Sequence, residues 1–106
     1  MTAYAVAILR DVRLGPPIVE YLEKIDATLA PYGGRFRIHG GPFEVREDGW
    51  PGTLIAIEFP DMDRARAWYD SPAYQEILPL RTGNSEGTAI LIEGVDDSHK
   101  ATDVLK

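Results

Sequence analysis

The chain has 106 residues, of which 44% are hydrophobic and 26% are charged, and it contains no cysteine. This length suits one domain with a real hydrophobic core, and the lack of cysteine excludes disulfides, thiolate nucleophiles and sulfur-ligated metals. The net charge of -6 argues against a nucleic-acid-binding protein, because phosphate contacts need a concentrated basic surface. No apolar run reaches the length of a membrane span, and the N-terminus lacks the basic residues of a signal peptide. We therefore expect a cytoplasmic protein that does not bind membranes.

The first part of the chain predicts a strand, a helix and a second strand. Residues 3–9 are apolar and partly β-branched, which is typical of a buried strand. A helix beginning at Pro17 is predicted by an apolar stripe at helical spacing: Ile18, Leu22, Ile25, Leu29 and Tyr32. Gly33 stands where a left-handed helix end is expected. Residues 35–39 alternate polar and apolar side chains, and residues 40–42 (GGP) interrupt them, so a kinked edge strand is predicted.

The middle of the chain predicts a hairpin followed by a helix that breaks and restarts. We expect the edge strand to resume at residues 43–47, to turn at Asp48-Gly49, and to return as a strand at residues 54–59. Asp61 and Ser71 each stand where the N-cap of a helix is favoured. One helical segment is therefore predicted after each of them.

The last part of the chain completes the fold. Pro79 is expected to end or kink the second helical segment, and residues 88–95 form the last predicted strand. The order β-α-β-β-α-β predicts a ferredoxin-like α+β domain at residues 1–95, in which an antiparallel four-stranded sheet carries both helices on one face. Residues 96–106 are expected to form a polar C-terminal tail.

Three of the predicted strands are apolar on both sides. In the last strand, Ala89 and Leu91 point to one face while Ile90 and Ile92 point to the other. Two helices can cover only one face of the sheet, and the other would be left as a large apolar patch. We therefore expect a homodimer in which two copies pack these bare faces together with twofold symmetry.

Candidate chemistry gathers on the second strand. Strict alternation places Arg35, Arg37 and His39 together on the face opposite Phe36. Arginine binds carboxylates and phosphates, and a histidine beside it can move a proton, so these residues predict an anion-binding cleft. The competing interpretation is structural, with the arginines as charged edge-strand residues that pair with Glu58.

A second candidate set is aromatic and consists of Tyr4, Tyr32, Trp50, Trp68, Tyr69 and Tyr74. Of these, the candidate ligand contacts are Tyr32, Trp68, Tyr69 and Tyr74. Aromatic groups with a polar tip line ligand pockets, but they also fill cores, and helical spacing favours a core role for Trp68 and Tyr69. Asp96, Asp97 and His99 stand close together in the predicted tail, which is a poor setting for a metal site. We expect neither a metal nor a cofactor.

Several short motifs together resemble one protein family. They are residues 31–36 (PYGGRF), 40–41 (GG), 57–60 (IEFP), 67–69 (AWY), 71–75 (SPAYQ) and 92–94 (IEG). This set is similar to the family catalogued as domain of unknown function 1330. The resemblance implies a dimeric α+β barrel, in which two ferredoxin-like units pair their sheets, but it implies no reaction. Other proteins with this barrel include small monooxygenases, isomerases and haem-degrading enzymes, which hold small ligands between sheet and helices or in the barrel.

Three functions stay open at this point. The first is a cofactor-independent enzyme, of isomerase or monooxygenase type, acting on a small anionic ring-bearing metabolite. In it, Arg35 and Arg37 hold the anion, His39 moves a proton, Glu58 orients or balances the site, and the aromatic set forms an apolar wall. The second is a non-catalytic dimer that binds a small acid in the same cleft. The third is a structural dimer in which both arginines are fully paired with carboxylates.

Overall fold

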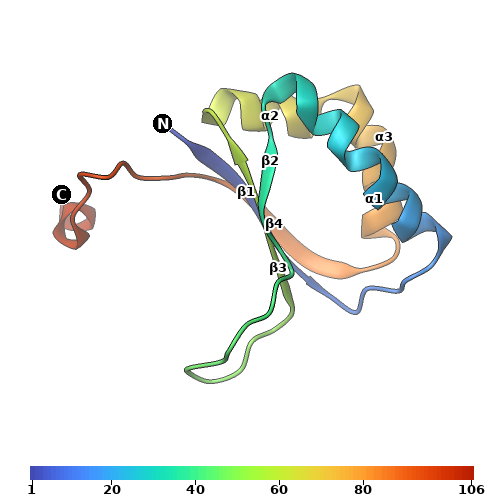
Figure 1. The fold of residues 1–106 in the computed structure, drawn as a ribbon, viewed down its shortest axis with the longest axis horizontal. Coiled ribbons are helices and arrows are strands. Elements are labelled where there is room, and N and C mark those ends of the chain that lie inside the picture. The colour runs from blue at the N-terminus through green and yellow to red at the C-terminus, as the bar shows by residue number, and fades with distance from the viewer.

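The computed structural model describes all 106 residues and contains one antiparallel four-stranded sheet (Figure 1). The strands are β1 (Ala3–Arg10), β2 (Arg35–His39), β3 (Thr53–Phe59) and β4 (Glu86–Glu93), in the spatial order β2-β3-β1-β4. The edge position predicted for the second strand is confirmed. The apolar first strand, β1, lies in the interior of the sheet between β3 and β4.

All three α-helices lie on the same side of the sheet (Figure 1). They are α1 (Pro16–Leu29), α2 (Met62–Asp70) and α3 (Pro72–Thr82), and two 3-10 helices cover Ala30–Tyr32 and Ala101–Leu105. Both predicted N-caps are present: Asp61 accepts a hydrogen bond from the amide of Arg64, and the Ser71 hydroxyl accepts one from the amide of Tyr74. This arrangement is the ferredoxin-like α+β fold that the sequence predicts.

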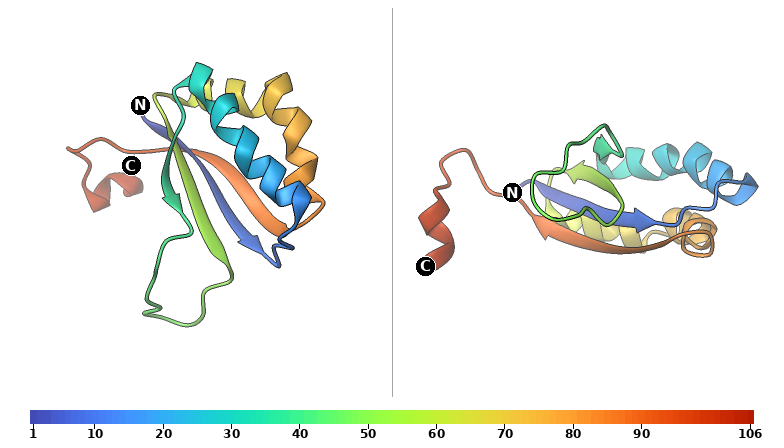
Figure 2. Two further views of the ribbon diagram at one scale, coloured as in Figure 1. Left: turned by 45° about the vertical axis from the view of Figure 1, so that its right-hand side comes forward. Right: turned by 90° about the horizontal axis from the view of Figure 1, so that it is seen from below.

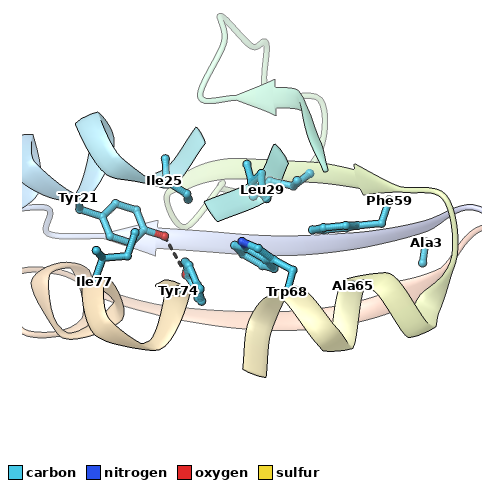
Figure 3. Close-up of a cluster of buried hydrophobic side chains, with 10 residues drawn as sticks. Ala3, Tyr21, Ile25, Leu29, Phe59, Ala65, Trp68, Tyr74 and Ile77 are labelled. Atoms are coloured by element: carbon cyan, nitrogen blue, oxygen red, sulfur yellow. Dashed lines mark hydrogen bonds between the residues drawn. The ribbon is translucent and has the colours of Figure 1, made fainter. Parts of the chain in front are cut away.

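The core lies between the sheet and the helices (Figure 3). Alternate residues of the strands point toward the helices, and we call this side of the sheet the inner face. Ala3 and Phe59 on the inner face are completely buried, and they share the core with Trp68 of α2. The Trp68 indole donates a hydrogen bond of 3.0 Å to the Thr28 hydroxyl, which joins α2 to α1.

The opposite side of the sheet, which we call the outer face, carries no helix. The strand register shows which side chains lie on it, and they include Tyr4, Val6, Ile8, Arg35, Ile38, Leu54, Ala56, Glu58, Thr88, Ile90 and Ile92. Ile90 and Ile92 are about half exposed, at 51% and 48%. The predicted bare apolar face is therefore present in the single chain.

Three local predictions are wrong. Residues 43–47 form no strand, and the whole connection from β2 to β3 extends away from the sheet as a loop (Figure 2). Pro79 was expected to end or kink its helix, and the first of these alternatives is wrong, since α3 continues to Thr82. Leu22 is 43% exposed, and Tyr21 occupies the buried stripe of α1 in its place.

Candidate functional site

Arg35, Arg37 and Glu58 form a cluster on the outer face. Glu58 lies opposite Arg35 in the register of β2 and β3. One carboxylate oxygen of Glu58 accepts a hydrogen bond of 3.2 Å from Arg35 and one of 3.0 Å from Arg37. The hydrogen bond from Arg37 is the main cause that holds the pKa of Glu58 below its ordinary value, and the weaker effect of desolvation opposes it. The two arginines therefore have a carboxylate partner within the chain, as the structural interpretation predicts.

His39 does not share a face with these arginines, and the expectation that all three lie together is wrong. The register of β2 against β3 shifts between Phe36 and Ile38, which marks a β-bulge. The extra residue reverses the alternation, so Phe36 and His39 both point to the inner face. Their rings stack with centroids 4.4 Å apart. Ile38 moves to the outer face, where it is 42% exposed.

A cavity of about 630 Å³ lies between the inner face and the helices, and we call it the sheet–helix cavity. Its floor includes small side chains of the sheet, Ala5, Ala7 and Ala89, and Ile18 and Ile25 of α1 form part of its wall. This volume is typical of sites for small organic molecules. His39 lines this cavity, whereas Arg35, Arg37 and Glu58 do not.

Aromatic side chains from α1, α2 and α3 form another part of the cavity wall. Trp68, Tyr69 and Tyr74 all line it, with 4.1 Å between the ring centroids of Trp68 and Tyr74 and 5.4 Å between those of Tyr69 and Tyr74. Three members of the predicted aromatic set are thus brought together. Tyr32 packs against the core from the 3-10 helix after α1 and does not line the cavity.

Tyr21 and Arg81 are polar residues of the cavity wall that the sequence does not predict as site residues. Tyr21 of α1 and Tyr74 of α3 join their hydroxyl groups in a hydrogen bond of 2.8 Å (Figure 3). Arg81 of α3 places its guanidinium carbon 5.9 Å from the centre of the Tyr21 ring. A signal for Arg81 exists in the sequence, because Tyr74, Ile77 and Arg81 follow at spacings of three and four and so share one helix face.

Burial is the largest influence on both of these polar groups. Burial raises the pKa of Tyr21, and the adjacent Tyr74 raises it further, so Tyr21 stays protonated and can donate a hydrogen bond at neutral pH. Burial acts to lower the pKa of Arg81, but Tyr74 and Tyr21 outweigh it, and the pKa is raised overall. Arg81 therefore brings a permanent positive charge to the cavity.

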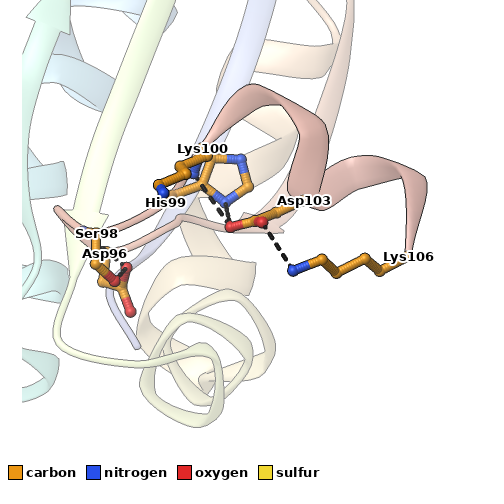
Figure 4. A network of polar contacts seen from close by, with 6 residues as sticks. All are labelled: Asp96, Ser98, His99, Lys100, Asp103 and Lys106. Carbon is orange, nitrogen blue, oxygen red and sulfur yellow. Dashed lines mark hydrogen bonds and ion pairs between the residues drawn. The ribbon is translucent and has the colours of Figure 1, made fainter.

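The C-terminal tail is held by contacts among its own residues (Figure 4). Asp103 accepts a hydrogen bond from the amide of Lys100 and pairs with His99 and Lys106, at 3.7 Å and 3.3 Å. No group of three or more histidine, aspartate or glutamate side chains in the chain is arranged to hold a metal ion. None of the helices is both long enough and apolar enough to cross a bilayer.

Several solved structures share this fold at low sequence identity. A protein of unknown function from Rhodopseudomonas palustris is 15% identical, and the match covers 90% of this chain and 83% of that one with a TM-score of 0.66. A dimeric ferredoxin-like protein of unknown function from Jannaschia sp. CCS1 is 16% identical, with coverage of 89% and 100% and a TM-score of 0.60.

A mutant form of SnoaB, a cofactor-independent oxygenase from Streptomyces nogalater, is 17% identical, with coverage of 93% and 98% and a TM-score of 0.57. No curated protein matches the chain. At these identities the solved structures establish the fold alone. The model of the family described as domain of unknown function (DUF1330) matches residues 2–95, which is most of the chain. The chain therefore belongs to this family, as the motifs in its sequence indicate.

Proposed function

We propose that this protein binds a small ring-bearing molecule in the sheet–helix cavity. The observation that carries the proposal is the cavity itself, about 630 Å³ in volume and walled by Trp68, Tyr69 and Tyr74. Flat aromatic walls favour flat ligands, because stacked or edge-on rings gain contact area with little loss of conformational freedom. Small alanine side chains on the sheet leave room for such a ring.

The finer proposal is a cofactor-independent reaction on this ligand, of oxygenase or isomerase type. It is supported by the shared fold with SnoaB and by the position of His39 on the cavity wall. An imidazole can take up or release a proton near neutral pH, which is the step that such a reaction on a ring needs. His39 is the proposed proton carrier, and Trp68, Tyr69 and Tyr74 hold the ring.

The proposed assembly is a homodimer that packs two outer faces together as a dimeric α+β barrel. The exposed apolar residues of the outer face support this assembly, and two proteins of the same fold are described as dimeric. In this arrangement Arg35, Arg37 and Glu58 lie in or beside the dimer interface, where they supply charge pairing and not ligand contacts.

A thermal-shift screen tests the proposed binding site. The panel holds aromatic acids, aromatic amides, dicarboxylates, phosphates and quinones. A ligand at 100 times its dissociation constant adds about 2.7 kcal/mol of stability, which raises the Tm of a domain of this size by about 10 °C. We expect a ring-bearing ligand to produce such a shift.

Two variants that each add the same side chain locate the ligand. Ala7→Phe adds a ring on the inner face between Ile55 and Ala89 and fills the cavity. Ala67→Phe adds the same ring at an exposed position of α2 and serves as the control. The proposal predicts that Ala7→Phe loses the thermal shift and Ala67→Phe keeps it. A shift that survives in Ala7→Phe places the ligand elsewhere and contradicts the proposal.

A non-catalytic binding protein is the second candidate function. Both candidates use the same cavity, and turnover separates them. The ligand found in the screen is incubated with the protein in the presence of dioxygen and is then analysed by mass spectrometry. A product that forms with the wild-type protein but not with His39→Ala supports an enzyme. Ligand that is recovered unchanged supports binding alone.

A further inference from the structure

The sheet–helix cavity contains positive charge and no negative charge. Arg81 is the one arginine or lysine that lines it, and no aspartate or glutamate does, although the chain has a net charge of -6. The remainder of the lining is mostly apolar. Beside a mostly apolar lining, a single cation acts more strongly on a ligand than it would in bulk water.

Arg81 has no ionic partner in the chain. Five other arginines form ion pairs with carboxylates: Arg35, Arg37, Arg46, Arg64 and Arg66. Arg81 forms none, and its guanidinium instead lies over the ring of Tyr21. A half-buried guanidinium has five N–H donors in a planar fork, an arrangement that fits the two oxygens of a carboxylate.

The tyrosine pair beside Arg81 supplies one more donor. Tyr21 and Tyr74 are almost completely buried, at 8% and 2% exposed, and each hydroxyl is the hydrogen-bond partner of the other. Two hydroxyl groups carry two protons, and their mutual bond uses one of them. The second proton has no protein acceptor, so it is free to meet an acceptor inside the cavity. Arg81, Tyr21 and Tyr74, which we call the donor cluster, thus offer hydrogen-bond donors and have no carboxylate partner in the cavity wall.

A helix-capping role explains only part of this arrangement. Arg81 lies in the last turn of α3, where a positive charge is favourable. An exposed side chain would meet that need equally well. Tyr21 and Tyr74 hold the guanidinium of Arg81 in the cavity wall, where its remaining N–H donors can meet a ligand.

We propose that the ligand of the sheet–helix cavity is a flat aromatic acid whose carboxylate is bound by the donor cluster, with Arg81 as the main contact. The ring then lies against Tyr69, which is only partly buried and packs on Trp68. This inference rests on the proposed function and names the class of molecule that the cavity takes. It also moves the anion-binding role from Arg35 and Arg37 on the outer face to Arg81 in the cavity.

A matched pair of probes tests the inference. 2-Naphthoate and 2-naphthamide share ring and shape but differ in charge, and their binding is measured by titration calorimetry. We expect the wild-type protein to bind 2-naphthoate about ten to one hundred times more tightly than 2-naphthamide, which is the range for a hydrogen-bonded charge. This comparison needs no variant, so it holds even if a substitution of Arg81 impairs folding.

Variants then assign the preference to one side chain. Arg81→Met keeps much of the length of the side chain and removes its charge, and we expect the two probes to bind it with similar affinity. Arg81→Lys keeps the charge without the planar fork and should retain part of the preference. Arg35→Met removes an arginine of the outer face, and we expect it to leave the preference unchanged.

The possible failures are distinguishable. If both probes bind the wild type equally and Ala7→Phe abolishes both, the cavity binds rings but the assignment of an acid is wrong. If Arg81→Met is less stable but keeps the full preference for 2-naphthoate, Arg81 has only a structural role and the proposal is overturned. If neither probe binds, the proposed function of the cavity fails together with the inference.

Discussion

Glu58 holds two arginine side chains through one carboxylate oxygen. Arg35 and Arg37 come from the same strand, and both reach Glu58 because it faces them across β2 and β3. The carboxylate is only partly accessible, with 23% of its side chain exposed. Two positive neighbours stabilise the ionised form of Glu58, so the cluster makes a contribution to stability that depends on pH.

We predict that Glu58→Gln loses the part of the unfolding free energy that depends on the ionised carboxylate of Glu58. The pKa of Glu58 is lowered in the folded state, so its contribution is present above the pKa of the unfolded chain and disappears as the pH falls through the lowered folded value. Urea unfolding at pH 7 and at pH 3 measures the difference between wild type and variant. We expect a larger difference at pH 7, and a difference that does not change with pH would contradict the prediction.

The sequence predicts the Glu58 cluster but not the position of His39. Pairing of Glu58 with Arg35 follows from simple alternation in two neighbouring strands, which the structure keeps at this point. One extra residue between Phe36 and Ile38 then reverses the pattern, and the sequence there contains no glycine that would signal a bulge. Arg81 was missed for a different reason, since a charged residue on a helix is usually exposed.

At the scale of the secondary structure elements, the sequence predicts a helix start correctly where a single side chain determines it. Asp61 and Ser71 cap their helices because a side-chain oxygen can satisfy a free amide at a helix start, whatever the remainder of the fold does. In residues 43–47 no single side chain determines the local structure. Their alternating pattern suits a strand, but pairing stops before them, and the last residue of β2, His39, lies opposite Ile55.

Pro79 lies inside α3 and lacks the amide proton that an α-helix uses there. We predict that Pro79→Ala stabilises the protein by about 2 kcal/mol. The gain from a regular helical residue is about 3 kcal/mol, and the greater freedom of the unfolded chain removes about 1 kcal/mol. Urea unfolding at pH 7 measures the change.

Pro72→Ala is the matched control for this prediction. Pro72 begins α3, where a helix needs no amide donor, so its replacement gains no hydrogen bond. We expect this control to lose about 0.5 kcal/mol through the unfolded chain alone. Equal effects at both positions would show that the interior location of Pro79 has no special cost.

At the scale of the whole molecule, the helices cover one face of the sheet and leave the other face bare. The inner face is covered and encloses the cavity, whereas the outer face presents Ile38, Ile90 and Ile92 to solvent. Patterns of apolar residues on both sides of the strands predicted this division. A sequence pattern cannot by itself position the second copy that the proposed dimer needs, because it contains no information on the distance or angle between two sheets.

Ile92→Lys tests the proposed dimer. A lysine at this position of the outer face places a charge where the two sheets would meet, and burial of an unpaired charge is strongly unfavourable. We expect the wild type to have the mass of a dimer in light scattering at micromolar concentration and Ile92→Lys to have the mass of a monomer. Val19→Lys is the control, because Val19 of α1 has a similar exposure of 44% but lies on the helical side. A monomeric wild type, or a dimeric Ile92→Lys, would contradict the assembly.

The central position of β1 also determines when the fold can form. β1 is the first strand to be synthesised, yet its two neighbours are β3 and β4, and Ala3 pairs with both Phe59 and Glu93. The sheet therefore cannot close until the residues of β4 have been synthesised and have left the ribosome. Until then, β1 is apolar on both sides and has no complete set of strand partners, which makes the nascent chain prone to aggregation. Sheet formation is thus expected to be completed by β4, the last strand along the chain.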